Sequence, residues 1–171
     1  MKRLIIYICL IFLSTNIFGQ VQRTTNSKFE EKIDDMLSET MPFIYVGELD
    51  DKDLNTTLIL DAREWEEYEV SHIPNARYIG YDNPVLSVLS DVTPHTEVVV
   101  YCSIGYRSEK IGEQLQRQGF TNVFNLYGSI FEWVNQGNDI EDINGKTTKK
   151  IHTYNKKWSQ WMINEHFQKV W

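Results

Sequence analysis

The residues with the clearest chemical potential lie in one run, from Cys102 to Ser108. Residues 98–101, just before the cysteine, have the β-branched, apolar pattern of a buried strand, and residues 108–118 have a helical pattern. A thiol just before a helix N-terminus faces unpaired backbone N–H groups and the positive end of the helix dipole, and both favour the thiolate. The positive charge of Arg107, five residues on, acts in the same direction. We therefore expect Cys102 to be an exposed nucleophile at neutral pH.

The loop after Cys102 is expected to act as an anion cradle. Gly105 permits a backbone turn that points successive amide N–H groups inward. Such amides would bind and stabilise an anionic sulfur adduct on the cysteine.

Composition and charge restrict the class of protein. Of the 171 residues, 42% are hydrophobic and 24% are charged, which is typical of one folded domain. The chain has 17 Lys and Arg against 24 Asp and Glu, and a formal charge of −7. A field of this sign repels nucleic-acid phosphate, so we expect no nucleic-acid partner.

The first residues have the pattern of a secretory signal. Two basic residues precede an apolar run over residues 4–13, and a polar break and the small residue Gly19 follow. The run is shorter than the about 20 residues of a membrane-spanning helix, so a buried core helix or an uncleaved anchor is the alternative. We expect cleavage after Gly19, export to the periplasm or the medium, and no membrane contact afterwards. Cleavage would leave a formal charge of 15 − 24 = −9 and would remove Cys9, so Cys102 would be the mature chain's one thiol.

Short apolar runs alternate with helical segments along the middle of the chain. The expected strands are residues 44–46, 58–60, 77–79, 98–101 and 123–126, and the expected helices are residues 29–39, 64–70, 85–89, 108–118 and 128–134. Apolar strands that alternate with helices indicate βαβ units and a parallel sheet covered on both faces. The expected fold class is therefore α/β, with the ligand beyond the carboxyl ends of the strands, where Cys102 stands.

Several motifs are similar, in the same order, to those of the rhodanese-like sulfurtransferases. Residues 58–68 (LILDAREWEEY) resemble that family's strand and acidic turn with its Asp-x-Arg. Residues 72–76 (HIPNA) resemble its second signature, residues 102–108 its active-site loop, and residues 119–133 its closing element. The resemblance implies a rhodanese-like parallel sheet of about five strands with helices on both faces.

The resemblance also divides the chain. It implies a rhodanese-like domain over residues 44–137, which leaves the signal peptide over 1–19, an N-terminal extension with a short helix over 20–43, and a C-terminal extension over 138–171. Two departures occur, at Ser71 and Ser129, where the family usually has glycine. They change the expected loop geometry and not the nucleophile.

The C-terminal extension is basic and rich in tryptophan. Trp158, Trp161 and Met162 fall at helical spacing, so we expect a terminal helix that lays its aromatic face on the domain. Aromatic residues among lysines can also stack on single-stranded nucleic acid, which is the disfavoured alternative.

The resemblance implies that Cys102 takes a sulfane sulfur from a small anionic donor such as thiosulfate and becomes a persulfide. A thiol, which can belong to a protein, or cyanide would then remove the sulfur. The implied substrate-binding residues are Ser103, Ile104, Gly105, Tyr106, Arg107 and Ser108. Their amides would stabilise the persulfide, and Arg107 would attract the donor. Asp61 and Arg63 are expected to support the loop through an ion pair, and His72 to be a structural histidine.

Two other functions stay open. Related folds use Cys-x5-Arg for phosphatase or arsenate reductase chemistry, but only four residues separate Cys102 from Arg107, and the smaller loop favours sulfur. The second is a module that binds a partner or carries sulfur to it without turnover, with the basic tail as the docking segment. Deletion of residues 146–171 would then separate turnover from partner binding. We expect no metal and no organic cofactor, because the four histidines lack metal-ligand spacing and a Gly-rich phosphate loop is missing.

Overall fold

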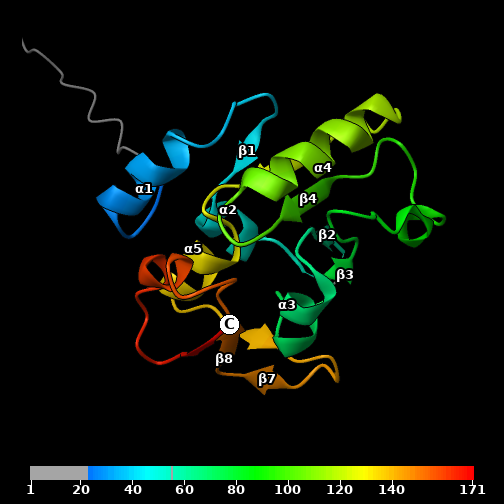
Figure 1. The fold of residues 1–171 in the computed structure, drawn as a ribbon. Coiled ribbons are helices and arrows are strands. Elements are labelled where there is room, and N and C mark those ends of the chain that lie inside the picture. The colour runs from blue at the N-terminus through cyan, green and yellow to red at the C-terminus, as the bar shows by residue number, and fades with distance from the viewer. Residues whose placement is uncertain (1–22, 55) are drawn as a thin grey trace, which may run out of the picture.

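The computed structural model describes residues 23–54 and 56–171 (Figure 1). The expected signal peptide, its cleavage site and Cys9 lie outside these residues. At the centre is a five-stranded parallel sheet with the strand order β1-β5-β4-β2-β3. Its strands are β1 (Phe43–Ile44), β2 (Leu58–Asp61), β3 (Arg77–Tyr78), β4 (Val98–Tyr101) and β5 (Val123–Leu126). The expected α/β class and the expected sheet are confirmed.

Helices cover both faces of the sheet because its central strands are apolar on both faces. Val99 packs in one core cluster with residues of α2 (Val46–Asp50) and α5 (Ser129–Asn135). The neighbouring Val100 points to the other face and packs with residues of α4 (Tyr106–Arg117). Figure 1 shows α4 and α5 on opposite sides of the sheet. Helices packed on both faces therefore hold β4 in place, and Cys102 follows the last residue of this strand.

Two expected elements of the middle region differ, one in its bounds and one in its type. The expected strand over 44–46 ends early, because α2 begins at Val46. The expected helix over 85–89 is a single 3-10 turn, η1 (Leu86–Leu89). The expected helix over 64–70 is α3 (Trp65–Val70), which follows β2.

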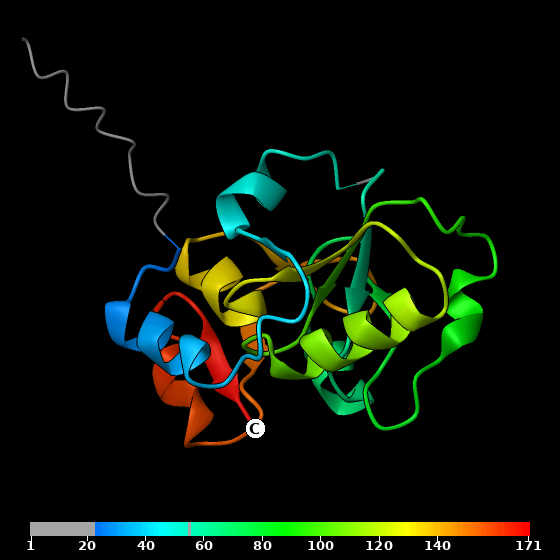
Figure 2. The same cartoon turned by 90° about the horizontal axis from the view of Figure 1, so that it is seen from above.

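The N-terminal helix α1 (Ser27–Asp34) joins the main core. The Asn26 side chain caps it by accepting hydrogen bonds from the N–H groups of Lys28 and Phe29. Phe29 and Ile33 are fully buried against the same cluster as α5. Figure 2 shows α1 beside the C-terminal segment, and the rings of Phe29 and Trp161 stack with centroids 5.7 Å apart. Both ends of the described chain therefore pack together.

The expected C-terminal helix is wrong. The segment instead forms the 3-10 turn η2 (Trp158–Trp161) and four short strands, β6 (Ile140–Glu141), β7 (Thr147–Thr148), β8 (Lys150–His152) and β9 (Gln168–Val170). The side-chain oxygen of Asn135 accepts hydrogen bonds from the N–H groups of Ile163 (2.7 Å) and Asn164 (3.2 Å). These bonds hold the chain extended after η2, so β9 returns to pair with β8 in parallel. No helix within residues 23–54 and 56–171 is long and apolar enough to cross a membrane.

Candidate active site

Cys102 directly follows β4 and lies under the loop that leads into α4. The backbone turns at Gly105, whose φ of +128° is one that other residues rarely adopt. The turn directs the Gly105 N–H toward the Cys102 sulfur, with the nitrogen 3.2 Å from Sγ. Only 1% of Cys102 is exposed, so the expectation of an exposed cysteine is wrong. The reason is that the loop closes around the sulfur instead of running past it.

The surroundings of the Cys102 sulfur favour the thiolate. Burial raises the pKa of the Cys102 thiol. The positive charge of Arg107 and the backbone N–H groups of Ser108, Gly105 and Ile104 lower this pKa by more, so the net pKa is below that of an ordinary thiol. An amide-lined thiolate at the start of a helix is nucleophilic at neutral pH.

The lowered pKa predicts the pH dependence of alkylation. Iodoacetamide reacts with the thiolate, so the alkylation rate falls when the thiol becomes protonated. The midpoint of this fall should lie at a lower pH than for an ordinary thiol, whose pKa is about 8.5. Arg107→Met should move the midpoint upward, because it removes the cation and leaves the Glu67 carboxylate unpaired. Arg117→Met, at the exposed far end of α4, is the matched control and should leave the midpoint in place. A wild-type midpoint at or above that of a free thiol would contradict this electrostatic account.

Glu67 of α3 holds Arg107, and the sequence did not indicate this role. The Arg107 guanidinium donates to both carboxylate oxygens of Glu67, at 2.6 and 2.9 Å. The Ser103 hydroxyl donates to the same carboxylate at 3.1 Å. Burial raises the pKa of Glu67, but the bond from Arg107 and its charge outweigh this and lower it, so Glu67 stays ionised. The charge of Arg107 is therefore shared between Glu67 and the thiolate.

The back of the loop is tied to β5. The Ser108 hydroxyl donates to the Asn125 side-chain oxygen at 2.7 Å, and the Asn125 amide donates to the Gly105 carbonyl at 2.9 Å. Asn125 is fully buried. The Ser108 side chain thus holds the loop shape, while its backbone N–H faces the cysteine. Asn125 is a second positioning residue that the sequence did not indicate.

Ser129, one of the two departures from the family pattern, supports the cysteine directly. Its φ of +51° lies in the left-handed region where glycine is usual. Its hydroxyl accepts a hydrogen bond from the Cys102 N–H at 3.1 Å and donates to the Leu126 carbonyl at 3.1 Å. The serine therefore keeps the glycine-like backbone and adds a contact that glycine lacks.

Asp61 and Arg63 form a fully buried ion pair at the end of β2. The Arg63 Nη2 lies 2.7 Å from Asp61 Oδ2 and donates to the Ser71 carbonyl at 2.6 Å. The Tyr101 hydroxyl, next to Cys102 in the chain, donates to Asp61 at 2.6 Å. Ser71, the other departure, has an extended backbone with φ of −174°, which needs no glycine. These contacts anchor β2 to β4 beside the loop.

His72 lies in this supporting layer and does not line the pocket. Its ring stacks on Tyr68 with centroids 4.0 Å apart, and its Nδ1 is 3.1 Å from the Tyr68 carbonyl oxygen. Its Nε2 is 3.5 Å from the Glu141 carboxylate, and the two backbones are bridged. These contacts agree with a structural histidine.

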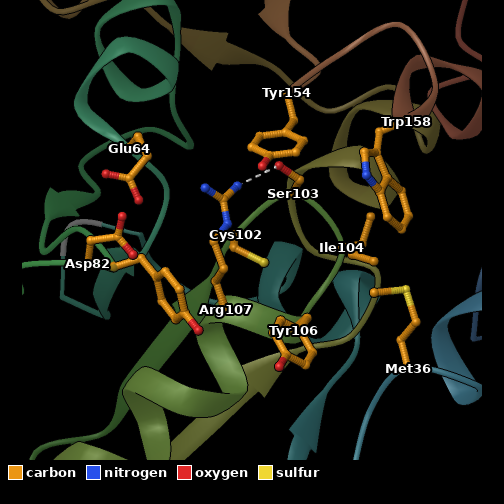
Figure 3. A pocket seen from close by; sticks show the side chains of 11 residues that line it. Met36, Glu64, Asp82, Cys102, Ser103, Ile104, Tyr106, Arg107, Tyr154 and Trp158 are labelled. Carbon is orange, nitrogen blue, oxygen red and sulfur yellow. Dashed lines mark hydrogen bonds between the residues drawn. The ribbon is translucent and has the colours of Figure 1, made fainter.

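A pocket of about 420 Å³ opens above the cysteine (Figure 3). Five residues of the expected set line it, namely Cys102, Ser103, Ile104, Tyr106 and Arg107, whereas Gly105 and Ser108 do not. Glu64, Asp82 and Tyr81 also line it, as do Met36, Tyr154 and Trp158 from the two ends of the chain. Within residues 23–54 and 56–171, no group of three or more His, Cys, Asp or Glu side chains is placed to hold a metal ion.

The parallel sheet thus places a cysteine, whose surroundings favour the thiolate, under an amide-lined loop. Residues 45–136 match the model of the Rhodanese-like domain. Because this match covers more than half of the chain, the chain belongs to the rhodanese-like family.

Among curated proteins, the chain is 34% identical over 96 residues to a tRNA uridine(34) hydroxylase of Yersinia enterocolitica, covering 53% of this chain and 27% of that protein. It is 35% identical over 83 residues to YrkF of Bacillus subtilis, which is named as a sulfur carrier protein, covering 48% of this chain and 43% of that protein. The chain thus spans less than half the length of these curated relatives.

Solved structures share the fold. A thiosulfate sulfurtransferase of Pseudomonas aeruginosa superposes with a TM-score of 0.55 at 24% identity, covering 78% of this chain and 25% of that one. The protein SSP1007 of Staphylococcus saprophyticus superposes with a TM-score of 0.50 at 28% identity, covering 59% of this chain and 99% of that one.

Proposed function

We propose that the protein is a sulfurtransferase that works through a persulfide on Cys102. The Cys102 thiolate attacks the outer sulfur of a donor such as thiosulfate, the Sγ–S bond forms, and sulfite leaves with the electron pair of the broken S–S bond. A thiol or cyanide then attacks the outer sulfur, and the Cys102 thiolate leaves. The observation that carries the proposal is the Cys102 sulfur under the Gly105 N–H, with a pKa lowered by Arg107 and three amides.

The geometry supports sulfur transfer over phosphoryl or arsenate chemistry. Phosphoryl or arsenate chemistry would leave a whole dianionic tetrahedral group on Cys102, which needs the full charge of Arg107, but Glu67 already binds this guanidinium through two oxygens. Sulfur transfer leaves only one sulfur atom on Cys102 after sulfite departs. Among the described residues that line the pocket, Arg107 is the one cation. Its remaining field suits the single charge of a thiolate or persulfide better than the charge of a phosphate.

Thiocyanate formation tests the proposed function. Wild-type protein should form thiocyanate from thiosulfate and cyanide with ping-pong kinetics, because the sulfur passes through a covalent intermediate. Absence of thiocyanate with thiosulfate and with organic thiosulfonates, while the thiol can still be alkylated, would contradict sulfurtransferase activity. That result would favour the non-enzymatic binding module.

The sulfur-carrier alternative needs a different test from deletion of residues 146–171. That segment supplies Ile151, Met162 and Phe167 to the main core, so its removal would destabilise the fold that positions the active site. Exposed lysines of the tail, such as Lys156 and Lys157, can be replaced with glutamate instead. A carrier would form the persulfide yet pass it to a partner protein, and these substitutions would weaken that transfer.

We propose further that the protein acts outside the cytoplasm, on the sequence pattern of residues 1–19. N-terminal sequencing of the protein from its native cells should then begin at Gln20. A chain that retains residues 1–19 in the cytoplasmic fraction would contradict export.

A further inference from the structure

The pocket is much larger than the small substrates that define the proposed reaction. Its volume of about 420 Å³ lies in the range of about 300–1,000 Å³ that is typical of sites for organic ligands. A water molecule in the liquid takes about 30 Å³, and cyanide or thiosulfate amounts to only a few such volumes. Beyond the active-site loop, the pocket is lined by segments from the two ends of the chain and by Glu64, Tyr81 and Asp82.

An apolar wall forms one side of this space. Met36, Ile104 and Trp158 lie together on one side of the cysteine in Figure 3. Met36 follows α1 and Trp158 begins η2, so both lie outside the family match over residues 45–136. The wall is therefore built mainly by segments that are additions to the common domain.

The apolar wall is held in place by the core. Met36 and Trp158 are partly buried and pack against the same cluster as α5. The backbone N–H of Trp158 donates to the side-chain oxygen and to the carbonyl oxygen of Asn155, both at 3.1 Å. The Arg107 guanidinium lies over the Tyr154 ring, 5.3 Å from its centroid, and this contact joins the tail to the active-site loop. A preformed apolar surface of this kind binds an apolar body at little ordering cost.

The side of the pocket opposite the wall is acidic. Glu64 and Asp82 face each other there in Figure 3, and burial and the charge of Asp82 raise the pKa of Glu64. Arg107, the one cation among the described lining residues, acts on Glu64 but is also bound to Glu67, so one positive charge faces three carboxylates. The persulfide adds a further negative charge. An acceptor whose body carries a negative charge beside Glu64 and Asp82 is therefore repelled, whereas an acceptor with a neutral or cationic body is not.

We propose that the sulfur acceptor is a low-molecular-weight thiol whose body is apolar and carries no negative charge. This inference rests on the proposed persulfide chemistry. The apolar body lies on the Met36 and Trp158 wall, and the acceptor sulfur reaches down to the pocket floor. The acceptor thiol loses its proton to solvent and its sulfur attacks the outer sulfur of the persulfide. A new S–S bond forms on the acceptor, and the Sγ–S bond breaks with its electron pair on Cys102. Since Cys102 is only 1% exposed, a free thiol can reach the sulfur more readily than a cysteine within a folded protein.

A single-turnover experiment tests this selectivity. The protein is loaded with thiosulfate, freed of excess donor, and mixed with benzyl mercaptan, 4-(mercaptomethyl)benzoic acid, 2-mercaptoethanol, a blocked Gly-Cys-Gly peptide or cyanide. Loss of the persulfide is followed by intact mass. Benzyl mercaptan should react about tenfold or more faster than 2-mercaptoethanol and the peptide, after correction for thiol pKa, because its ring is buried against the wall. The carboxylate analogue should be slower than benzyl mercaptan.

Variants connect the selectivity to the wall and to the acidic side. Trp158→Ala should bring benzyl mercaptan to within about threefold of 2-mercaptoethanol, and Met36→Ala gives the same test if the first variant fails to fold. Trp171→Ala, which removes a 59% exposed indole outside the pocket lining, is the matched control and should keep the wild-type ratio. Glu64→Gln should reduce discrimination against the carboxylate analogue.

The outcomes separate this inference from the proposed function. If the persulfide forms and cyanide removes it, but all thiols react alike or the peptide is fastest, the acceptor proposal is overturned and the sulfurtransferase proposal stands. If no persulfide forms with any donor, the proposed function itself has failed. A wild-type ratio retained in both Trp158→Ala and Met36→Ala would also overturn the role of the wall.

Discussion

Cys102→Ser is expected to lower sulfur transfer at least about 10³-fold while changing the free energy of unfolding by no more than about 1 kcal/mol. The activity is lost because a serine hydroxyl is not ionised at neutral pH and cannot hold a persulfide. The fold is kept because the serine oxygen can accept the Gly105 N–H that now bonds to sulfur. Thiocyanate formation and denaturant unfolding measure the two quantities.

This pair of measurements also decides between two explanations of a nearly buried cysteine. A cysteine with 1% exposure can be an inert core residue as well as a nucleophile held in a closed loop. A large stability loss in Cys102→Ser together with retained activity would identify a core residue and contradict the site described above. Cys102→Ala removes the acceptor of the Gly105 N–H and should be less stable than the serine variant.

Arg63→Met is expected to cost about 3–5 kcal/mol of unfolding free energy, the largest stability effect that the structure predicts. Arg63 and Asp61 are both fully buried, so the substitution leaves the Asp61 carboxylate as an uncompensated charge in the core. It also removes the donor to the Ser71 carbonyl. Denaturant unfolding of wild type and variant under the same conditions measures the difference.

Arg77→Met is the matched control, because it removes the same side chain from an exposed ion pair. The Arg77 and Asp91 side chains are 42% and 64% exposed, and pairs of this kind contribute about 0–1 kcal/mol. Equal losses in the two arginine variants would contradict the view that burial makes the Asp61–Arg63 pair essential.

The sheet and the nucleophile could be predicted because their signals are local. Residues 98–101 are apolar throughout, and the helical pattern begins a few positions later, so the position of Cys102 between strand and helix follows from short-range order alone. The need for Gly105 is also local, since the turn demands a positive φ.

The role of Glu67 could not be predicted, because α3 offers several similar acidic residues. Glu66, Glu67 and Glu69 all occur in one short helix, and sequence alone gives each the character of a solvated residue. Only Glu67 among them is buried, and its partner Arg107 is 40 residues away in the chain. The assembled fold selects it, because α3 packs across the active-site loop.

The expected C-terminal helix was wrong for a similar reason, because a distant residue decides the local structure. The i, i+3 spacing of Trp158 and Trp161 fits an α-helix, and it fits a single 3-10 turn equally well, with Met162 just after the turn. The choice is made by Asn135, which captures the backbone N–H groups after the turn. Met36 and Trp158 are also far apart in the chain, so no local sequence pattern indicates that they form one pocket wall together.

Intact mass of the purified protein before and after thiosulfate, and then after cyanide, tests the central claim most directly. We expect a gain of one sulfur atom, about 32 Da, that cyanide removes and that Cys102→Ser does not show. A mass that does not change with thiosulfate or organic thiosulfonates, in protein whose Cys102 can still be alkylated, would contradict a persulfide enzyme.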